Sequence, residues 1–125
     1  IELYRSPINQ FVAEFIGSPK MNIINLHGEN KIDLSNIRPP DNSSKLGIRP
    51  EHLFVDNENN SKLSGEVRHI ENLGEHLLCY IRIKDENEIT AKLDVKSKVN
   101  TNELIRLNWL NENTHFFDTL SNSVK

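Results

Sequence analysis

Polar and apolar side chains alternate along residues 77–84, which read Leu77-Leu78-Cys79-Tyr80-Ile81-Arg82-Ile83-Lys84. The same alternation recurs in residues 89–96 and 105–109. A period of two gives each strand one buried face and one wet face, as in antiparallel sheet. Residues 72–75 and 85–88 predict the turns between these strands. Several short strands in so small a chain predict a mainly β fold, a small closed or nearly closed antiparallel barrel.

The first half of the chain predicts weaker strands. Residues 23–26 and 31–34 have the composition of two short strands, and residues 46–48 predict a third that ends before Pro50. Between them, residues 36–45 are rich in Pro, Asn and Ser and predict turns.

One short amphipathic α-helix is predicted ahead of the barrel. Ser6 is a suitable N-cap and Pro7 fits the first helical position. The following large apolar residues lie at helical spacing and form one stripe, namely Ile8, Phe11, Val12, Phe15 and Ile16. Gly17 suits the left-handed position at the end of a helix, and Pro19 prevents its continuation. The stripe predicts a partner surface, either the barrel or a domain that precedes it.

Composition narrows the classes of function. The chain has 125 residues, 26% of them charged, and a formal net charge of −3, which argues against a protein whose main affinity is for nucleic-acid phosphates. Its single cysteine, Cys79, excludes an internal disulfide framework. No apolar run reaches the roughly eighteen residues that cross a bilayer, and the first residues do not resemble a signal peptide. These features predict a cytoplasmic location.

Four motifs carry a family resemblance. They are the entry Gly17-Ser18-Pro19 with Met21-Asn22, the central motif Gly47-Ile48-Arg49-Pro50-Glu51-His52, the block Gly65, Val67, Ile70-Glu71 and Leu73-Gly74-Glu75, and the closing His115-Phe116-Phe117-Asp118. Together they resemble the C-terminal regulatory domain of ATP-binding subunits of sugar-importing ABC transporters, of the maltose and multiple-sugar type. The segment 23–45 is shorter than in most of that family, and turn-rich residues stand where a further hairpin is often found.

The resemblance implies a division of the chain and a set of partners. Residues 1–17 would be the last helix and linker of a missing nucleotide-binding domain, and residues 18–125 a transport-associated barrel related to the oligonucleotide/oligosaccharide-binding (OB) fold. Such domains pair with a second copy, serve an ATPase bound to permease subunits at the inner face of the membrane, and in some members receive signals from a cytoplasmic regulatory protein. The chain would not be an enzyme. It contains no G-x-x-x-x-G-K-[ST] loop, so ATP and Mg are expected only in the upstream domain.

Five residues are candidates for an interface or regulatory surface. Arg49 and Glu51 would point to one side of a strand continued through Pro50, and a structural hydrogen-bond cluster is the favoured interpretation. Glu75 lies at a predicted hairpin tip. Phe116 and Phe117 are adjacent, so in a strand only one of them should face inward and the other should cap the barrel or reach a partner.

Other chemistry-bearing residues have plainer interpretations. His69, Glu71, Glu75 and His76 lie close in sequence but do not have a metal-site spacing, so a solvated hairpin is expected. Cys79 and Trp109 lie in apolar stripes and are predicted core residues. No catalytic residue, metal ligand or cofactor ligand is predicted.

Two other functions remain as alternatives. One is a small-ligand barrel that senses oxyanions in a different class of ABC importer. The other, less favoured, is a barrel that binds single-stranded nucleic acid. Such sites need exposed aromatic residues interleaved with Lys and Arg, whereas aromatic residues make up only 6% of this chain. The sequence does not identify the transported sugar.

Overall fold

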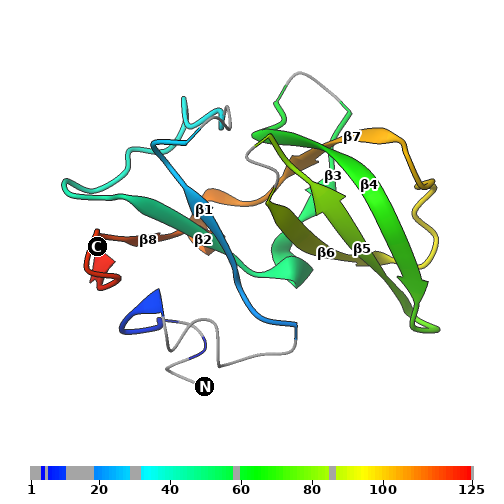
Figure 1. Ribbon diagram of the computed structural model, residues 1–125, viewed down its shortest axis with the longest axis horizontal. Helices are drawn as coiled ribbons and strands as arrows, with labels where there is room; N and C mark the ends of the chain where they lie inside the picture. The colour runs from blue at the N-terminus through cyan, green and yellow to red at the C-terminus, as the bar shows by residue number, and fades with distance from the viewer. Residues whose placement is uncertain are drawn as a thin grey trace.

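The computed structural model describes residues 4, 6–10, 19–28, 32–57, 60–84 and 87–124. It contains two antiparallel sheets and two single turns of 3₁₀-helix (Figure 1). The strands, in chain order, are β1 (Asn22–Asn25), β2 (Lys45–Ile48), β3 (Phe54–Val55), β4 (Leu63–Asn72), β5 (His76–Arg82), β6 (Glu88–Asp94), β7 (Leu104–Asn108), β8 (His115–Phe117) and β9 (Ser123–Val124). The 3₁₀ turns are η1 (Pro50–His52) and η2 (Asn111–Asn113). The predicted mainly β class is confirmed.

The larger sheet has the strand order β3-β7-β4-β5-β6 and contains the three alternating runs of the sequence. In β5 and β6 buried side chains alternate with more exposed ones, because each strand turns every second residue toward the core. The β4–β5 hairpin closes at the predicted turn, where Gly74 has a φ of 98° that favours glycine. The pairing of β4 with β5 shifts between Val67 and His69, a β-bulge that bends the longest strand.

The smaller sheet has the order β1-β2-β8-β9 and joins segments that are far apart in sequence. The predicted strands at 23–26 and 46–48 are confirmed as β1 and β2. The predicted strand at 31–34 is wrong for its described residues, 32–34, which form no strand. There the backbone N–H of Asp33 donates to the carbonyl of Lys62, so this segment packs against the start of β4.

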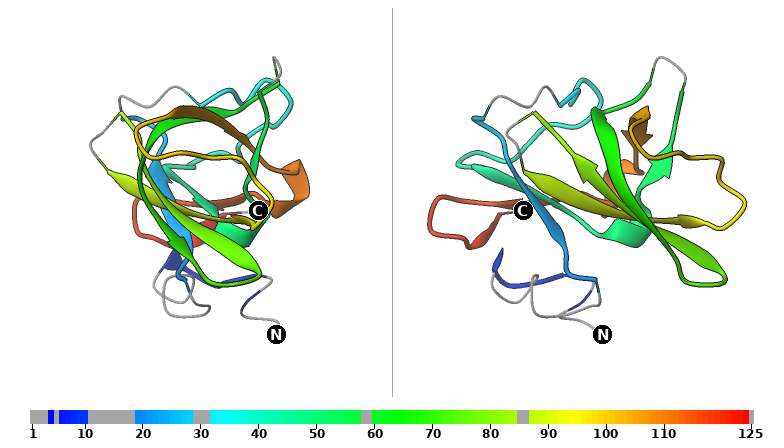
Figure 2. Two further views of the ribbon diagram at one scale, coloured as in Figure 1. Left: turned by 90° about the vertical axis from the view of Figure 1, so that its right-hand side faces the viewer. Right: turned by 45° about the vertical axis from the view of Figure 1, so that its right-hand side comes forward.

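The two sheets share one core and meet along β1 and β6. Side chains from both sheets form a single buried cluster that includes Ile24, Val67 and Trp109. Figure 2 (left) shows strands of both sheets around this common interior. At the seam the side-chain amide of Asn22 donates to the carbonyl of Thr90 and accepts from its N–H, both at 2.8 Å. The Asn22 side chain therefore substitutes for a neighbouring strand and covers the edge of β6.

The predicted start of the N-terminal helix is wrong. Asn9 instead forms an antiparallel bridge with Asn122, and the carbonyl of Ile8 accepts from the N–H of Ser123. Ile8 is 65% exposed, so it does not contribute to a buried helical stripe. The rest of the predicted helix, residues 11–16, lies outside the described residues. Among the residues that the structure describes, no helix has the length and apolar character needed to cross a membrane.

Candidate functional site

Arg49 lies at the exit of β2 and is buried to 1% exposure. Its Nη2 donates to the carbonyl of Tyr4 at 3.0 Å, and its guanidinium carbon lies 4.0 Å from the centre of the Tyr4 ring. A hydrogen bond combined with a cation–π contact holds Tyr4 against the exit of β2. Burial lowers the pKa of Arg49 from its ordinary value, because the charged form loses its hydration.

Arg49 and Glu51 do not share a face. The chain turns into η1 at Pro50, so it does not continue as a strand, and Glu51 is exposed while Arg49 is buried. The condition for a common side, a strand continued through Pro50, is therefore not met, and the predicted end of the strand before Pro50 is confirmed. Pro50 fixes the backbone at the first position of the turn, where its missing N–H leaves no intrahelical partner unsatisfied.

A pocket of about 360 Å³ lies beside Arg49. We call it the Arg49 pocket, and its lining residues are Tyr4, Arg49, His52, Glu112, Asn113 and His115. Burial lowers the pKa of His115, and electrostatic repulsion from Arg49 and His52 lowers it further. The Nδ1 atom of His52 is buried and has no hydrogen-bond partner in the described part of the chain. The pocket therefore brings one buried guanidinium, two imidazoles and the Glu112 carboxylate together beside Tyr4.

Phe116 and Phe117 are both buried, at 7% and 0% exposure. Only one of them, Phe116, faces the main core, as expected, and the opposite face of β8 with Phe117 is also covered. Phe116 belongs to the main core, whereas Phe117 packs with Met21 in a separate small cluster. A Cβ atom on Gly47 of the neighbouring strand would lie 2.5 Å from Met21 Sδ and 2.8 Å from Phe117 Cε2, which explains why this position is glycine. Neither ring is exposed in this chain, and a role in an interface stays a prediction.

Glu75 is exposed in the turn of the β4–β5 hairpin. Its carbonyl accepts from the N–H of Val95 at 3.3 Å, so the hairpin end and the turn after β6 lie together. Leu73 and Val95 at this end are 54% and 37% exposed. Figure 1 shows this end of the sheet at the lower right, away from β8 at the left. Glu75 is therefore separate from the Arg49 pocket, and its regulatory role remains a prediction.

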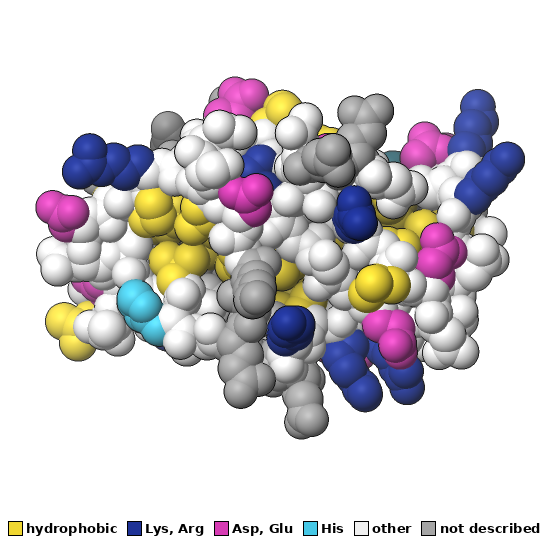
Figure 3. All heavy atoms as spheres, turned by 90° about the horizontal axis from the view of Figure 1, so that it is seen from above, with side chains coloured by type: hydrophobic (Ala, Val, Ile, Leu, Met, Phe, Trp, Pro, Cys, Tyr) yellow, Lys and Arg dark blue, Asp and Glu magenta, His cyan; other side chains and the backbone are white. Residues whose placement is uncertain are grey.

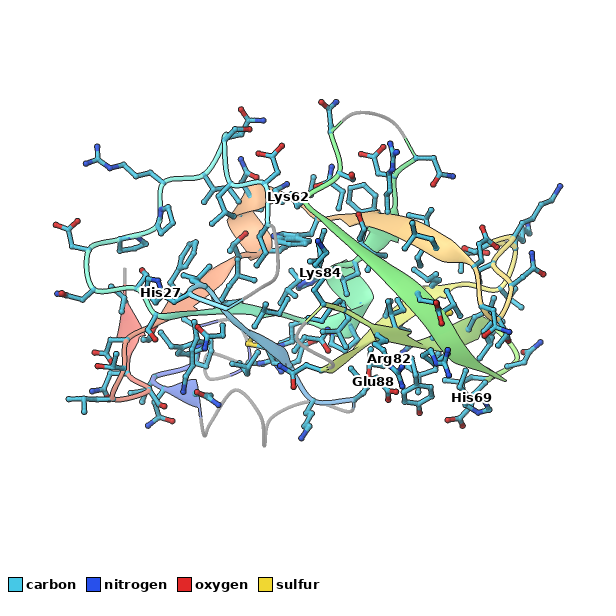
Figure 4. All side chains as sticks on the ribbon, turned by 45° about the horizontal axis from the view of Figure 1, so that its top comes forward. His27, Lys62, His69, Arg82, Lys84 and Glu88 are labelled. Carbon is cyan, nitrogen blue, oxygen red and sulfur yellow. The ribbon has the colours of Figure 1, made fainter. Side chains whose placement is uncertain are left out.

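The outer face of the hairpin has its own side-chain contacts. The ring of His69 stacks on Tyr80 with centroids 5.7 Å apart, and the Tyr80 hydroxyl donates to Glu71 at 2.6 Å. Figure 4 places His69 toward the far end of β4 and Lys62 at its start. Across the top of the molecule, Figure 3 shows basic and acidic side chains interspersed with separate apolar groups.

A clasp between the two ends of the chain was not predicted. We call it the terminal clasp and define it as residues 8–10 with residues 121–123. The N–H of Gln10 donates to the carbonyl of Ser121, and the N–H of Ser123 to the carbonyl of Ile8, at 2.8 and 2.9 Å. Lys45 Nζ donates to Gln10 Oε1 at 2.8 Å and so ties the clasp to β2. The sequence does indicate a turn at Asp118, whose carboxylate accepts two backbone N–H groups. It does not indicate that residues 121–123 after this turn pair with residues 8–10, because the two stretches are far apart in sequence.

Lys62 forms a second unpredicted cluster around the predicted core residue Trp109, which is buried as expected. Lys62 Nζ donates to Asn108 Oδ1 at 2.7 Å and to the carbonyl of Trp109 at 2.6 Å. The Trp109 indole N–H donates to Thr114 Oγ1 at 2.8 Å. Burial lowers the pKa of Lys62, against a smaller opposing effect of nearby carboxylates. The cluster fixes the chain after β7 and is structural.

Cys79, the other predicted core residue, is also fully buried.

The motifs of these strands match a known family. The family model of the TOBE domain matches residues 46–117, from β2 to the end of β8. The chain belongs to the TOBE domain family. The Arg49 pocket contains residues from both ends of this match, since His52 is the last residue of the Gly47–His52 motif and His115 is in β8.

The TOBE domain has relatives among the ATP-binding proteins of importers. It is 33% identical to the sn-glycerol-3-phosphate import ATP-binding protein UgpC of Psychromonas ingrahamii, over 94% of this chain and 35% of that protein. It is 34% identical to the alpha-glucoside transport ATP-binding protein AglK of Rhizobium meliloti, over 100% of this chain and 39% of that protein. It is 38% identical to the maltose/maltodextrin import ATP-binding protein MalK of Vibrio cholerae, over 67% of this chain and 27% of that protein. The predicted resemblance to ATP-binding subunits of sugar importers is confirmed. The chain spans less than two fifths of the length of these relatives.

Proposed function

We propose that this TOBE domain is the regulatory and dimerisation domain of the ATP-binding subunit of a sugar importer. The observation that carries the proposal is the match to importer ATP-binding proteins over 94% and 100% of this chain, within relatives more than twice as long. The two sheets would correspond to the OB-like barrel that the resemblance implies.

The domain would be non-catalytic by itself. Its sequence lacks the glycine-rich loop and lysine that hold nucleotide phosphates, so ATP and Mg would bind in a preceding domain. The longer protein would be a transport ATPase on the inner face of the plasma membrane, with permease subunits as partners. A cytoplasmic regulatory protein would be a further partner of this domain.

The terminal clasp and the Arg49–Tyr4 contact support a mechanical role. Together they attach the N-terminal segment to the smaller sheet at two places. A preceding domain would therefore be held close to the barrel, so that barrel–barrel pairing would keep two ATPase domains together. The exposed hairpin end at Glu75 would remain accessible to a second copy or a regulator.

The test compares a full-length protein containing this domain with a version truncated before it. Light scattering of both proteins without nucleotide, and ATP hydrolysis by both, are the measurements. We expect the full-length protein to be dimeric and the truncated protein to be monomeric. The truncated protein keeps all the ATP-binding residues of the preceding domain. We expect the isolated domain to bind no ATP in calorimetry. Equal dimerisation with and without the domain would refute the dimerisation role, and ATP hydrolysis by the isolated domain would refute the non-catalytic role.

A further inference from the structure

The turn between β8 and β9 holds Ser121 in the left-handed backbone region. Its φ is 66°, a conformation that favours glycine. Among the residues that the structure describes, the other non-glycine residues with positive φ are Asn42 and Asn102, and asparagine tolerates this region. In a short hairpin loop such a position is usually taken by glycine or asparagine. A serine here therefore needs a reason beyond the turn itself.

The Ser121 side chain supplies that reason, because it lies inside the terminal clasp. Its hydroxyl donates to Gln10 Oε1 at 3.1 Å and accepts from Lys45 Nζ at 3.3 Å. Lys45 Nζ also donates to the same Gln10 oxygen, at 2.8 Å. We call these three side chains the clasp cluster. Glycine at position 121 would relax the backbone but would remove one of the three members.

The terminal clasp buries little apolar surface on either side. Among residues 6–10 only Pro7 is buried, and Ile8 is 65% exposed. On the other side of the clasp, Leu120 is 80% exposed. A segment with so little buried apolar surface opens at a lower free energy than a core strand does. Polar contacts therefore decide how firmly residues 8–10 are held.

The turn that receives residues 8–10 is held by its own hydrogen bonds. The Asp118 carboxylate accepts from the N–H groups of Leu120 and Asn122, both at 2.9 Å. The N–H of Ser121 donates to the Asp118 carbonyl at 3.0 Å, and β9 pairs with β8. None of these bonds involves residues 8–10, so the turn and β9 keep their shape when the clasp opens.

We propose that the terminal clasp is a latch, in which residues 8–10 detach from β9 and return while both sheets stay folded. The clasp cluster sets the balance between the closed and open states. Opening leaves the edge of β9 unpaired and leaves Tyr4 on Arg49 as the other attachment described above. The latch would thereby change a preceding domain from two points of attachment to one. That last consequence rests on the proposed function, whereas the latch itself does not.

The experiment is native-state hydrogen exchange of the 125-residue chain, followed by NMR at urea concentrations below the unfolding midpoint. The N–H groups of Gln10 and Ser123 form the backbone bonds that cross the clasp. A local opening exposes little surface, so urea should leave their exchange rates unchanged. Amides in the middle of the β4–β5 pairing should exchange faster as urea rises. The same urea dependence in both groups would show that the clasp opens only with the whole barrel, and would overturn the proposal.

A charge variant tests the clasp cluster. Lys45→Met keeps a long side chain and removes a charge-assisted hydrogen bond, so Gln10 and Ser123 should exchange about tenfold faster. The Asn122 amide, which is bonded within the turn, should keep its wild-type rate. Lys96→Met, exposed in the turn after β6, is the control and should change none of these rates. Unchanged exchange at Gln10 and Ser123 in Lys45→Met would overturn the role of the cluster.

Two variants of Ser121 separate its hydroxyl from its backbone conformation. Ser121→Ala and Ser121→Gly both remove a neutral hydrogen bond, so both should speed exchange across the clasp by about fivefold, although glycine also relaxes the turn. Thr119→Ala removes an exposed hydroxyl from the same turn and should have no effect. Slower exchange in Ser121→Gly than in wild type would show that backbone strain controls the clasp, and equally faster exchange at Asn122 would show that β9 frays. Either result would overturn the proposal.

Dimerisation and ATP hydrolysis enter none of these exchange rates. Failure of the latch would therefore leave the proposed function untouched, and failure of the proposed function would leave the latch.

Discussion

Replacing Asn22 by alanine should separate the two sheets at their seam. The side chain is buried at 8% exposure and makes two hydrogen bonds of 2.8 Å to the backbone of Thr90. Asn22→Ala removes both bonds and leaves the N–H and C=O of Thr90 without these partners at the edge of β6. Each buried group left unsatisfied costs about 1–3 kcal/mol, and water that reaches the seam would reduce this cost. We therefore expect a loss of about 2–4 kcal/mol, a large part of the roughly 5–15 kcal/mol typical of a domain.

The assay is urea unfolding followed by fluorescence of Trp109, which is the only tryptophan and is 1% exposed. Ser64→Ala, on the exposed face of β4, is the control and should change stability by less than about 0.5 kcal/mol. Asn22→Asp keeps an oxygen that accepts from Thr90 but places a carboxylate against its carbonyl. At pH 7 we therefore expect Asn22→Asp to be less stable to unfolding than wild type. The difference should be smaller at a pH of about 4, where a protonated carboxyl can donate to the Thr90 carbonyl.

Hydrogen exchange tests the location of the effect. The amide of Thr90 should exchange faster in Asn22→Ala, while the amides in the middle of the β4–β5 pairing should follow the global stability. An Asn22→Ala variant within about 0.5 kcal/mol of wild type would refute the reasoning, because the amide would then not be what joins the sheets.

Three further perturbations test other contacts. Gly47→Ala places a methyl group 2.8 Å from the Phe117 ring, so urea unfolding should show a loss of about 1–3 kcal/mol; unchanged stability would mean that the ring moves away freely. His115 has a folded-state pKa below its unfolded value of 6.5, so unfolding takes up a proton as the pH falls below 6.5 and stability falls with it. His115→Gln should flatten that part of the curve of stability against pH, whereas His69→Gln, on the exposed hairpin, should leave it unchanged. Equal slopes in the two variants would contradict the role of burial at His115. Lys62→Met removes hydrogen bonds of 2.6 and 2.7 Å, so the free energy of unfolding in urea should fall by about 1–3 kcal/mol. A raised urea midpoint would show that the cost of burying the Lys62 charge exceeds the gain from its hydrogen bonds.

Local patterning predicted the larger sheet well. The period of two in residues 77–84 and 89–96 depends only on which side chains a strand turns inward, and it holds in β5 and β6. Gly74 marked the hairpin turn for the same local reason, since its positive φ is a property of one residue. Cys79 and Trp109 were identified as core because each shares the apolar face of its strand.

The start of the N-terminal helix was mispredicted at residues 6–9 because the partner of this stretch lies at the other end of the chain. Ser6 and Pro7 have local helix-start chemistry, yet Asn9 bridges to Asn122, and no local pattern encodes that pairing. Tertiary context overrides a weak propensity in such segments. The cover over Phe117 has a related cause, since Met21, remote in sequence, packs on the face of β8 that a lone strand would expose.

The sequence by itself determined the β class, the central hairpin, the core residues of the alternating strands and the family motif that contains Arg49. Only the tertiary structure decided what that motif does, by placing Tyr4, His52, Glu112 and His115 around one buried guanidinium. The physical reason is range. Strand periodicity and turn conformation are set by neighbours in sequence, whereas the seam at Asn22, the terminal clasp and the Arg49 pocket depend on groups that only the folded core brings together.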